Sequence, residues 1–215
     1  LLQQRYAKDP ALEVEEWQVK NYRDCSISQL FSGLEELGIK LDPDTFEEYA
    51  DSADSPEDLA EEFGKLVPEV KKEIYPLLFE LWRRLLDDRE TISIFCDELD
   101  WAIIAYEDRI EGTDELIQLM LMELVDILDG NIDAGKKAKT IFRHVSSYLA
   151  QDLESFIYNY TYDQISKGNL TLASELLDDF YEYVSGNLWF DFLRLKLMQG
   201  VPAEDATAIV ARFIE

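Results

Sequence analysis

Apolar residues recur at intervals of three and four along most of the chain, and this spacing constrains the fold more than any other feature. In an α-helix such residues share one face, so the pattern predicts amphipathic helices. The clearest stripe is Val67, Val70, Ile74, Leu77, Leu78, Leu81 and Leu85. Pro68 suits the first turn of that helix. Pro76 lies inside it and should kink or split it, because proline removes a backbone hydrogen bond.

Capping residues predict where the helices begin and end. Asp42-Pro43 and Ser55-Pro56 each place a capping side chain directly before a proline that fits the first helical position. Gly64 and Gly168 are expected to end the helices that precede them, because glycine readily adopts the left-handed conformation found there. A last helix is expected to open at Val201-Pro202. Its inward side chains would be Ala206, Ile209, Val210 and Phe213.

The segment 114–129 is apolar on nearly every side, which predicts a central helix buried by its neighbours. The segment 156–162 alternates with period two, as a strand does. No second strand-like segment could pair with it, so we expect a helix there as well. The sequence therefore predicts an all-α fold of about ten short-to-medium antiparallel helices packed around the helix 114–129. Their arrangement would be a bundle or an irregular α-α superhelix.

The 215 residues fit one domain or two small ones. We predict a single helical domain over residues 1–215. A subdivision would separate an acidic helical part, residues 1–64, from a helical core, residues 65–215. Gly168, Asn169, Ala173, Leu177 and Phe180 resemble the second helix of a tetratricopeptide repeat. The preceding helix does not match that repeat and no period of about 34 residues recurs, so no family is identified.

Acidic residues outnumber basic ones by 46 to 20, which gives a net charge of −26. Such a chain lacks the basic face of a general nucleic-acid binder, and at 47% apolar residues it is not a disordered one. Ten of the 21 residues from Asp42 to Glu62 are acidic, and no Lys or Arg lies between Lys40 and Lys65. Solubility explains an acidic surface. A merely soluble surface mixes both signs, however, so this segment is also a candidate face for a basic partner.

Two motifs near residue 130 come close to known ligand loops. The segment Gly130–Lys137 has the G-x-x-x-x-G-K spacing of a phosphate-binding loop, but Lys137 replaces the Ser or Thr and a helix precedes it. Asp129–Asp133 alternates oxygen ligands as a calcium loop does. Ala134 and Thr140 stand where that loop needs Gly and Glu. We interpret the segment as a turn between two helices.

The remaining candidates for chemistry are few. One basic cluster stands out, and it would be either a site for an anion or acidic partner or a counter-charge to the chain's own acidic helices. It consists of Lys136, Lys137, Lys139, Arg143 and His144. His144 is the only histidine, and Ser146 and Ser147 would not face it on a helix. We predict no catalytic residue, cofactor or metal, and an uncharacterised carboxylate hydrolase is the enzyme hypothesis that remains.

Two functional hypotheses follow. The first is an all-helical protein-interaction module, an adaptor or scaffold without catalytic activity. The alternative is an acidic neutraliser of a basic protein, such as an immunity protein, a nucleic-acid mimic or a chaperone-like protein. We expect another protein as the partner, with no direct contact to nucleic acid or membrane. Cys25 and Cys96 form no ligand pair. One disulfide between them is the alternative to two free thiols, and a reducing, cytoplasmic setting is the simpler interpretation.

The candidate partner-binding residues combine the acidic segment with two tyrosines from the aromatic series of residues 180–192. That series is expected to serve first as core packing between the last three helices. At least one of its aromatics is expected to be exposed, however, and an exposed tyrosine among acids is a good interface anchor. The predicted set is Asp44, Glu47, Glu48, Asp51, Asp54, Glu57, Asp58, Glu61, Glu62, Tyr181 and Tyr183.

Overall fold

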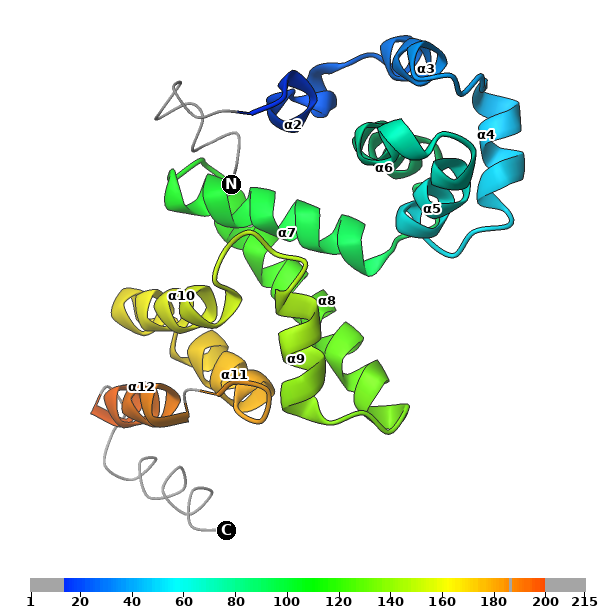
Figure 1. The fold of residues 1–215 in the computed structure, drawn as a ribbon. Helices are drawn as coiled ribbons and strands as arrows, with labels where there is room; N and C mark the ends of the chain where they lie inside the picture. Colours follow the sequence, from blue (N-terminus) through cyan, green and yellow to red (C-terminus); the bar gives the residue numbers. More distant parts are fainter. Residues whose placement is uncertain (1–13, 186, 200–215) are drawn as a thin grey trace. The chain divides into compact units, whose positions relative to one another are not determined.

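In a computed structural model of the protein, residues 14–185 and 187–199 are described. Within them the chain forms eleven α-helices, α2 to α12, and two short 3₁₀ helices without any β-strand (Figure 1). This confirms the all-α prediction. The chain divides into two compact units, residues 1–95 and 96–215. The helix expected after Pro202 lies outside the described residues.

In the first unit, α6 is the element against which the others pack. Its elements are α2 (Glu16–Val19), η1 (Tyr22–Asp24), α3 (Ile27–Glu36), α4 (Pro43–Ala50), α5 (Pro56–Leu66), η2 (Pro68–Val70), α6 (Lys71–Leu85) and the start of α7 (Ile92–Glu107). Helices α3, α4 and α5 all contact α6 (Figure 1). Leu34, Phe46 and Leu59 from those three helices meet Ile74 and Leu78 of α6 in one buried core. The apolar stripe predicted for α6 is therefore the face that the core buries.

Side-chain caps set the start of the helices that carry the acidic segment. Asp42 accepts a hydrogen bond from the N–H of Thr45 at 2.9 Å, and Thr45 Oγ1 accepts one from the N–H of Asp42 at 2.9 Å. Ser55 accepts the N–H of Asp58 at 3.1 Å. Both caps were predicted, because a short polar side chain before a proline satisfies N–H groups that the first turn leaves without helical partners.

Two details of the first unit differ from the prediction. Helix α5 does not end at Gly64 but continues to Leu66. Gly64 is buried, and a Cβ there would lie 2.5 Å from Cγ of Lys71, so glycine is needed for the close approach of the following segment. Helix α6 is not split at Pro76. The carbonyl that loses its partner belongs to Lys72, an exposed residue of the first turn, where water can bind it.

The boundary between the units lies after Phe95 and not after Gly64. Leu59 and Phe63, from the acidic part, share one core with Ile74 from the segment that follows. A division at residue 64 would cut through that core. Charge follows the exposed faces of helices, whereas the limits of a compact unit follow their buried faces.

The second unit holds the remainder of α7 and five further helices. They are α8 (Thr113–Asp133), α9 (Ala138–Ser146), α10 (Leu153–Lys167), α11 (Leu170–Phe180) and α12 (Asn187–Gln199). Helix α9 packs on α8, while α10, α11 and α12 each contact the other two (Figure 1). Ile157, Leu177 and Leu193, one from each of these three helices, are buried. Among the described helices none is both long and apolar enough to cross a membrane.

Helix α8 corresponds to the apolar segment 114–129. Ile117, Leu121 and Leu124 are buried, as expected. Leu119 and Met122, however, are 64% and 66% exposed. The helix carries more apolar side chains than the core has places for, so its neighbours do not enclose it on every side as the sequence predicted.

Helix α10 settles the choice between helix and strand for residues 156–162 in favour of the helix. Phe156, Ile157 and Tyr160 are buried at helical spacing, while Tyr162 is 40% exposed. The helix ends at Gly168, whose φ of +85° favours glycine. The predicted end of this helix is confirmed.

Polar contacts hold α10 in place at both ends. At its start, Asp100 of α7 accepts the N–H of Ala150 at 2.6 Å and of Gln151 at 2.9 Å. Further along, the Tyr106 hydroxyl donates to Asp163 Oδ2 at 2.7 Å. Burial, together with this hydrogen bond to a carboxylate, raises the pKa of Tyr106 to about 12. The two hydrogen bonds of Asp100 hold the chain at the start of α10, whose N-terminal turn forms one wall of the pocket described below.

Candidate functional site

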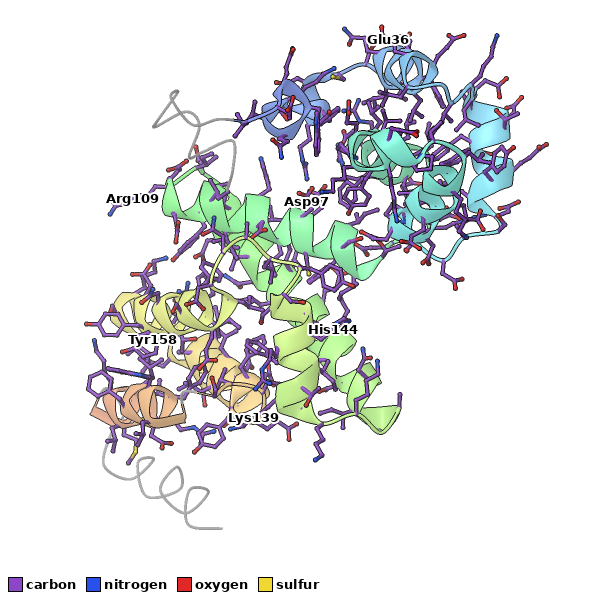
Figure 2. The ribbon with its side chains drawn as sticks, viewed as in Figure 1. Glu36, Asp97, Arg109, Lys139, His144 and Tyr158 are labelled. Atoms are coloured by element: carbon purple, nitrogen blue, oxygen red, sulfur yellow. The ribbon has the colours of Figure 1, made fainter. Side chains whose placement is uncertain are left out.

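The acidic segment lies on α4, α5 and the turn between them. Glu57 is partly buried, and the other predicted acids are exposed: Asp44, Glu47, Glu48, Asp51, Asp54, Asp58, Glu61 and Glu62. Side chains tipped with oxygen project outward from α4 in Figure 2. The structure therefore keeps these acids on the surface of two consecutive helices.

Several of these acids have partners within the first unit. Glu61 Oε1 lies 2.6 Å from Lys71 Nζ, and the hydrogen bond and charge of this lysine lower the pKa of Glu61. Arg89 Nη2 lies 2.5 Å from Asp51 Oδ1. Glu57 accepts a hydrogen bond from the Tyr75 hydroxyl at 2.6 Å. Part of the acidic segment thus forms ion pairs and hydrogen bonds with side chains of its own unit.

The two predicted tyrosines are not the exposed aromatics of the second unit. Tyr183 is only 1% exposed, and its hydroxyl donates to Asp129 Oδ1. Tyr181 is partly buried, with Arg194 4.0 Å from its ring centroid and its hydroxyl bonded to Asp191 Oδ1 at 3.0 Å. Tyr183 therefore has no surface to offer a partner in this conformation, and Tyr181 is engaged by its own unit.

The exposed aromatics lie on α12 instead. Leu188, Phe192 and Leu195 are 83%, 50% and 61% exposed, and their spacing of four and three residues forms one stripe. Trp189, beside this stripe, is 65% exposed. On the opposite face the side chains of Phe190, Leu193 and Leu197 are buried. Helix α12 thus carries two apolar stripes, of which only one enters the core.

This outer stripe was visible in the sequence as the spacing of Leu188, Phe192 and Leu195. Sequence reasoning missed it because a helix that is apolar on two faces is normally assigned to the interior. Only the observed packing shows which stripe the neighbouring helices cover.

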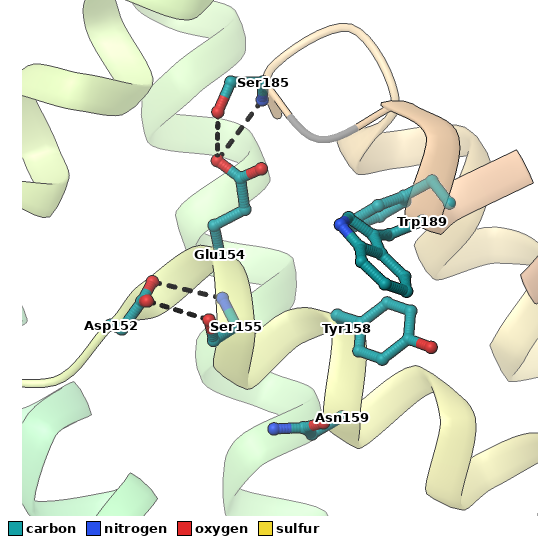
Figure 3. Close-up of a pocket in the computed structure, with 8 residues that line it drawn as sticks. Asp152, Glu154, Ser155, Tyr158, Asn159, Ser185 and Trp189 are labelled. Atoms are coloured by element: carbon teal, nitrogen blue, oxygen red, sulfur yellow. Dashed lines mark hydrogen bonds between the residues drawn. The ribbon is translucent and has the colours of Figure 1, made fainter. Parts of the chain in front are cut away.

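A pocket of about 540 Å³ lies between the first turns of α10 and α12 (Figure 3). Its lining residues are Asp152, Glu154, Ser155, Tyr158, Asn159, Ser185, Trp189 and Phe190. The rings of Tyr158 and Trp189 meet edge to face, with centroids 6.0 Å apart and planes at 74°. The volume falls within the range of about 300–1,000 Å³ that is usual for ligand pockets.

Hydrogen bonds fix the two carboxylates of this pocket (Figure 3). Asp152 caps α10 by accepting the N–H of Ser155 at 3.2 Å and its hydroxyl at 2.8 Å. Glu154 Oε2 accepts the hydroxyl of Ser185 at 2.7 Å and its N–H at 3.2 Å. The wall of the pocket is therefore acidic on one side and aromatic on the other.

The basic cluster lies on and just before α9, where Lys136, Lys137, Lys139, Arg143 and His144 are all exposed. Lys136 Nζ donates to Asn131 Oδ1 at 2.7 Å, and the His144 ring meets Tyr148 edge to face at 5.3 Å. These contacts come from neighbouring positions on the chain. The anion or acidic-partner site and the counter-charge to acidic helices both stay predictions.

The segment that resembles ligand loops is a connection between two helices, as interpreted from the sequence. Helix α8 runs through Gly130 to Asp133, Gly135 turns the chain with φ of +88°, and α9 begins at Ala138. Over the described part of the chain, no group of three or more His, Cys, Asp or Glu side chains is arranged to hold a metal ion.

Among the residues that the structure describes, Asp100 and Asp179 are the carboxyl groups with a raised pKa, and neither lines the pocket. Burial raises the pKa of Asp100 despite its two backbone hydrogen bonds. Burial and nearby acids, including Asp178 and Glu175, raise that of Asp179. Neither of these two acids is among the charges that raise the pKa of the other.

No protein-family model, curated protein or solved structure matches the chain.

Proposed function

We propose that this chain is an all-helical protein-interaction module, and that its partner binds to the outer stripe of α12. The observation that carries the proposal is the exposure of Leu188, Trp189, Phe192 and Leu195 on one helix. Single exposed apolar residues are common, whereas a contiguous set of this size marks interaction surfaces. Large aromatic side chains are also the residues that most often dominate binding energy.

The spacing and the charge together indicate the occupant. Anchors at i, i+4 and i+7 suit a partner helix that lays its own apolar face along α12. The pocket beside the stripe contributes two carboxylates, Asp152 and Glu154, and the whole chain carries a net charge of −26. A basic amphipathic helix from another protein matches both properties, because opposite charge speeds association and apolar contact holds the complex.

Synthetic helical peptides test this proposal. One peptide has leucines at i, i+4 and i+7 with lysines elsewhere, and a second has glutamates in place of the lysines. Fluorescence anisotropy should show binding of the lysine peptide, weakened by salt, and weak or no binding of the glutamate peptide.

Two double variants locate the site on the protein. In Phe192→Ser/Leu195→Ser the Kd of the lysine peptide should rise at least about tenfold, because each substitution removes about 1.5–3 kcal/mol of apolar burial. The control Leu119→Ser/Met122→Ser alters equally exposed apolar residues on α8 and should change the Kd little. Equal losses in both variants, or equal binding of the two peptides, would contradict the proposal.

A second candidate function, the acidic neutraliser of a basic protein, is supported by α4. Its residues Asp44, Glu47 and Glu48 are exposed and form no ion pair with any residue that the structure describes. If this face binds a basic protein, Glu47→Lys/Glu48→Lys should slow association with poly-L-lysine, while reversal of the exposed acids Glu123 and Asp126 on α8 should not. No change in the association rate would count against this function.

We also propose that the module acts in the cytoplasm. Both cysteines, Cys25 and Cys96, are free thiols. A chain without disulfides suits a reducing compartment.

A further inference from the structure

The pocket between α10 and α12 combines an aromatic wall with an acidic wall. Tyr158 and Trp189 present aromatic faces and edges, while Asp152 and Glu154 present carboxylates a few residues away (Figure 3). An aromatic ring attracts a cation through its quadrupole, and a carboxylate attracts it through its charge. An apolar stem ending in a positive group would satisfy both walls at once.

Charge in the pocket also favours a cation over an anion. The N-terminal ends of α10 and α12 each contribute about half a positive charge. Asp152 and Glu154 place two carboxylates beside these helix starts. The carboxylates oppose the binding of an anionic ligand, although two helix starts are near.

Other tyrosines of the same unit already have cations of their own. Lys196 Nζ lies 3.3 Å from the ring centroid of Tyr162, and Lys167 Nζ lies 5.4 Å from that of Tyr106. Within residues 14–185 and 187–199, no Lys or Arg lies over the ring of Tyr158 or Trp189. Among the described residues, the rings beside the two carboxylates thus differ from those of Tyr106 and Tyr162 in having no cation over them.

We propose that this pocket binds a lysine or arginine side chain of the partner protein, with the charged end between the carboxylates of Asp152 and Glu154 and the aliphatic stem against Trp189 and Tyr158. The inference rests on the proposed interaction function and names the chemical group that the partner must supply. Long basic side chains suit such a site, because their stems pack on apolar surface while their ends stay polar.

Small probes test the pocket separately from the stripe on α12. N-acetyl-lysine methylamide is titrated into the full chain, and the indole N–H resonance of Trp189 is followed by NMR after assignment with Trp189→Phe. N-acetyl-norleucine methylamide has the same apolar stem without the charge. The lysine probe should shift the resonance saturably, and the norleucine probe should bind at least about tenfold more weakly, a loss of about 1.4 kcal/mol.

Conservative variants separate charge from folding. Asp152→Asn keeps an acceptor for the N–H of Ser155, and Glu154→Gln keeps an acceptor for Ser185, while each variant removes a charge. Each should weaken the lysine probe about threefold to tenfold. Glu175→Gln, an exposed residue on α11, makes the same change of net charge and should leave binding unchanged.

Three results would overturn the inference. They are equal binding of the lysine and norleucine probes, preferential binding of N-acetyl-glutamate methylamide, and tighter binding of the free diamine putrescine than of the lysine probe. The last would identify a free polyamine as the ligand. These small probes do not cover the stripe. Peptide binding by Phe192→Ser/Leu195→Ser therefore tests the proposed function, and lysine-probe binding by Asp152→Asn tests the pocket. Either proposal can be contradicted without the other.

Discussion

Glu80 is a buried charge of the first unit, and its removal should be strongly destabilising. The side chain of this α6 residue is 3% exposed. It accepts hydrogen bonds from Arg83 Nε at 3.0 Å and from Arg84 Nε at 2.5 Å. Arg84 in turn donates to the carbonyl oxygens of Cys25 at 2.7 Å and Arg23 at 2.6 Å. One carboxylate thus orients the guanidinium that holds η1 and the residue after it against α6.

The cost of Glu80→Ala follows from this geometry. Removing one member of a buried ion pair costs about 3–5 kcal/mol, because it leaves the partner's charge uncompensated. Arg83 and Arg84 each retain 21% of their side-chain exposure, so water can partly solvate them. We therefore expect the lower end, a loss of about 3 kcal/mol in the free energy of unfolding.

Urea denaturation followed by tryptophan fluorescence measures this loss, because Trp82 on the same helix is buried in the same core. The exposed residue Glu36 on α3 supplies the control, since Glu36→Ala should change stability by less than about 0.5 kcal/mol (Figure 2). A loss below about 1 kcal/mol in Glu80→Ala would refute the view that this cluster holds the unit together.

The pH dependence supplies an independent check on Glu80. Burial alone would raise its pKa, but the hydrogen bonds and charges of Arg83 and Arg84 lower it below the ordinary 4.5. The stability that this charge contributes is therefore complete above pH 4.5 and disappears as the pH falls through the lowered pKa. The difference in stability between wild type and Glu80→Gln should shrink over that acidic range.

Three further outcomes are expected. Gly168→Ala should cost about 1–2 kcal/mol in thermal or urea unfolding, because φ is +85° there, and an unchanged stability would contradict the strain argument. Asp152→Ala should cost about 1 kcal/mol, whereas Asp152→Asn should cost little, and similar losses would show that capping is not the cause. Iodoacetamide at pH 8 should label the partly exposed Cys25 much faster than Cys96, because burial and Asp100 raise the pKa of Cys96 to about 12. Equal labelling of the two cysteines in mass spectrometry would contradict this expectation.

Local chemistry made most of the helix limits predictable from the sequence. Some helix limits depend only on side chains and φ values within a few residues, so the local sequence is enough to predict them. Examples are the caps at Asp42 and Ser55 and the helix end at Gly168. The prediction that Gly64 ends its helix was wrong because the role of this glycine is not local. Its role is to admit Lys71, a contact that depends on how the next segment returns over α5.

The candidate site was less predictable, because exposure is a property of packing. The aromatic series predicted that some ring would be exposed, but Tyr183 turned inward to Asp129 and Trp189 turned outward. The pocket joins residues from α10 and α12 whose meeting depends on α11 between them. No local pattern marks Glu154 as the partner of Ser185.

The two stripes of α12 have a consequence for how the second unit folds. A helix that is apolar on opposite faces could dock with either face inward, so hydrophobicity alone leaves its rotation about its own axis undecided. The polar side chains between the stripes decide it. Arg194 reaches Asp178 at 3.1 Å and stacks on Tyr181, and Lys196 covers the ring of Tyr162. A half-turn of the helix about its axis would break all three contacts at once. These two cations therefore fix the orientation of α12 and keep its outer stripe on the surface.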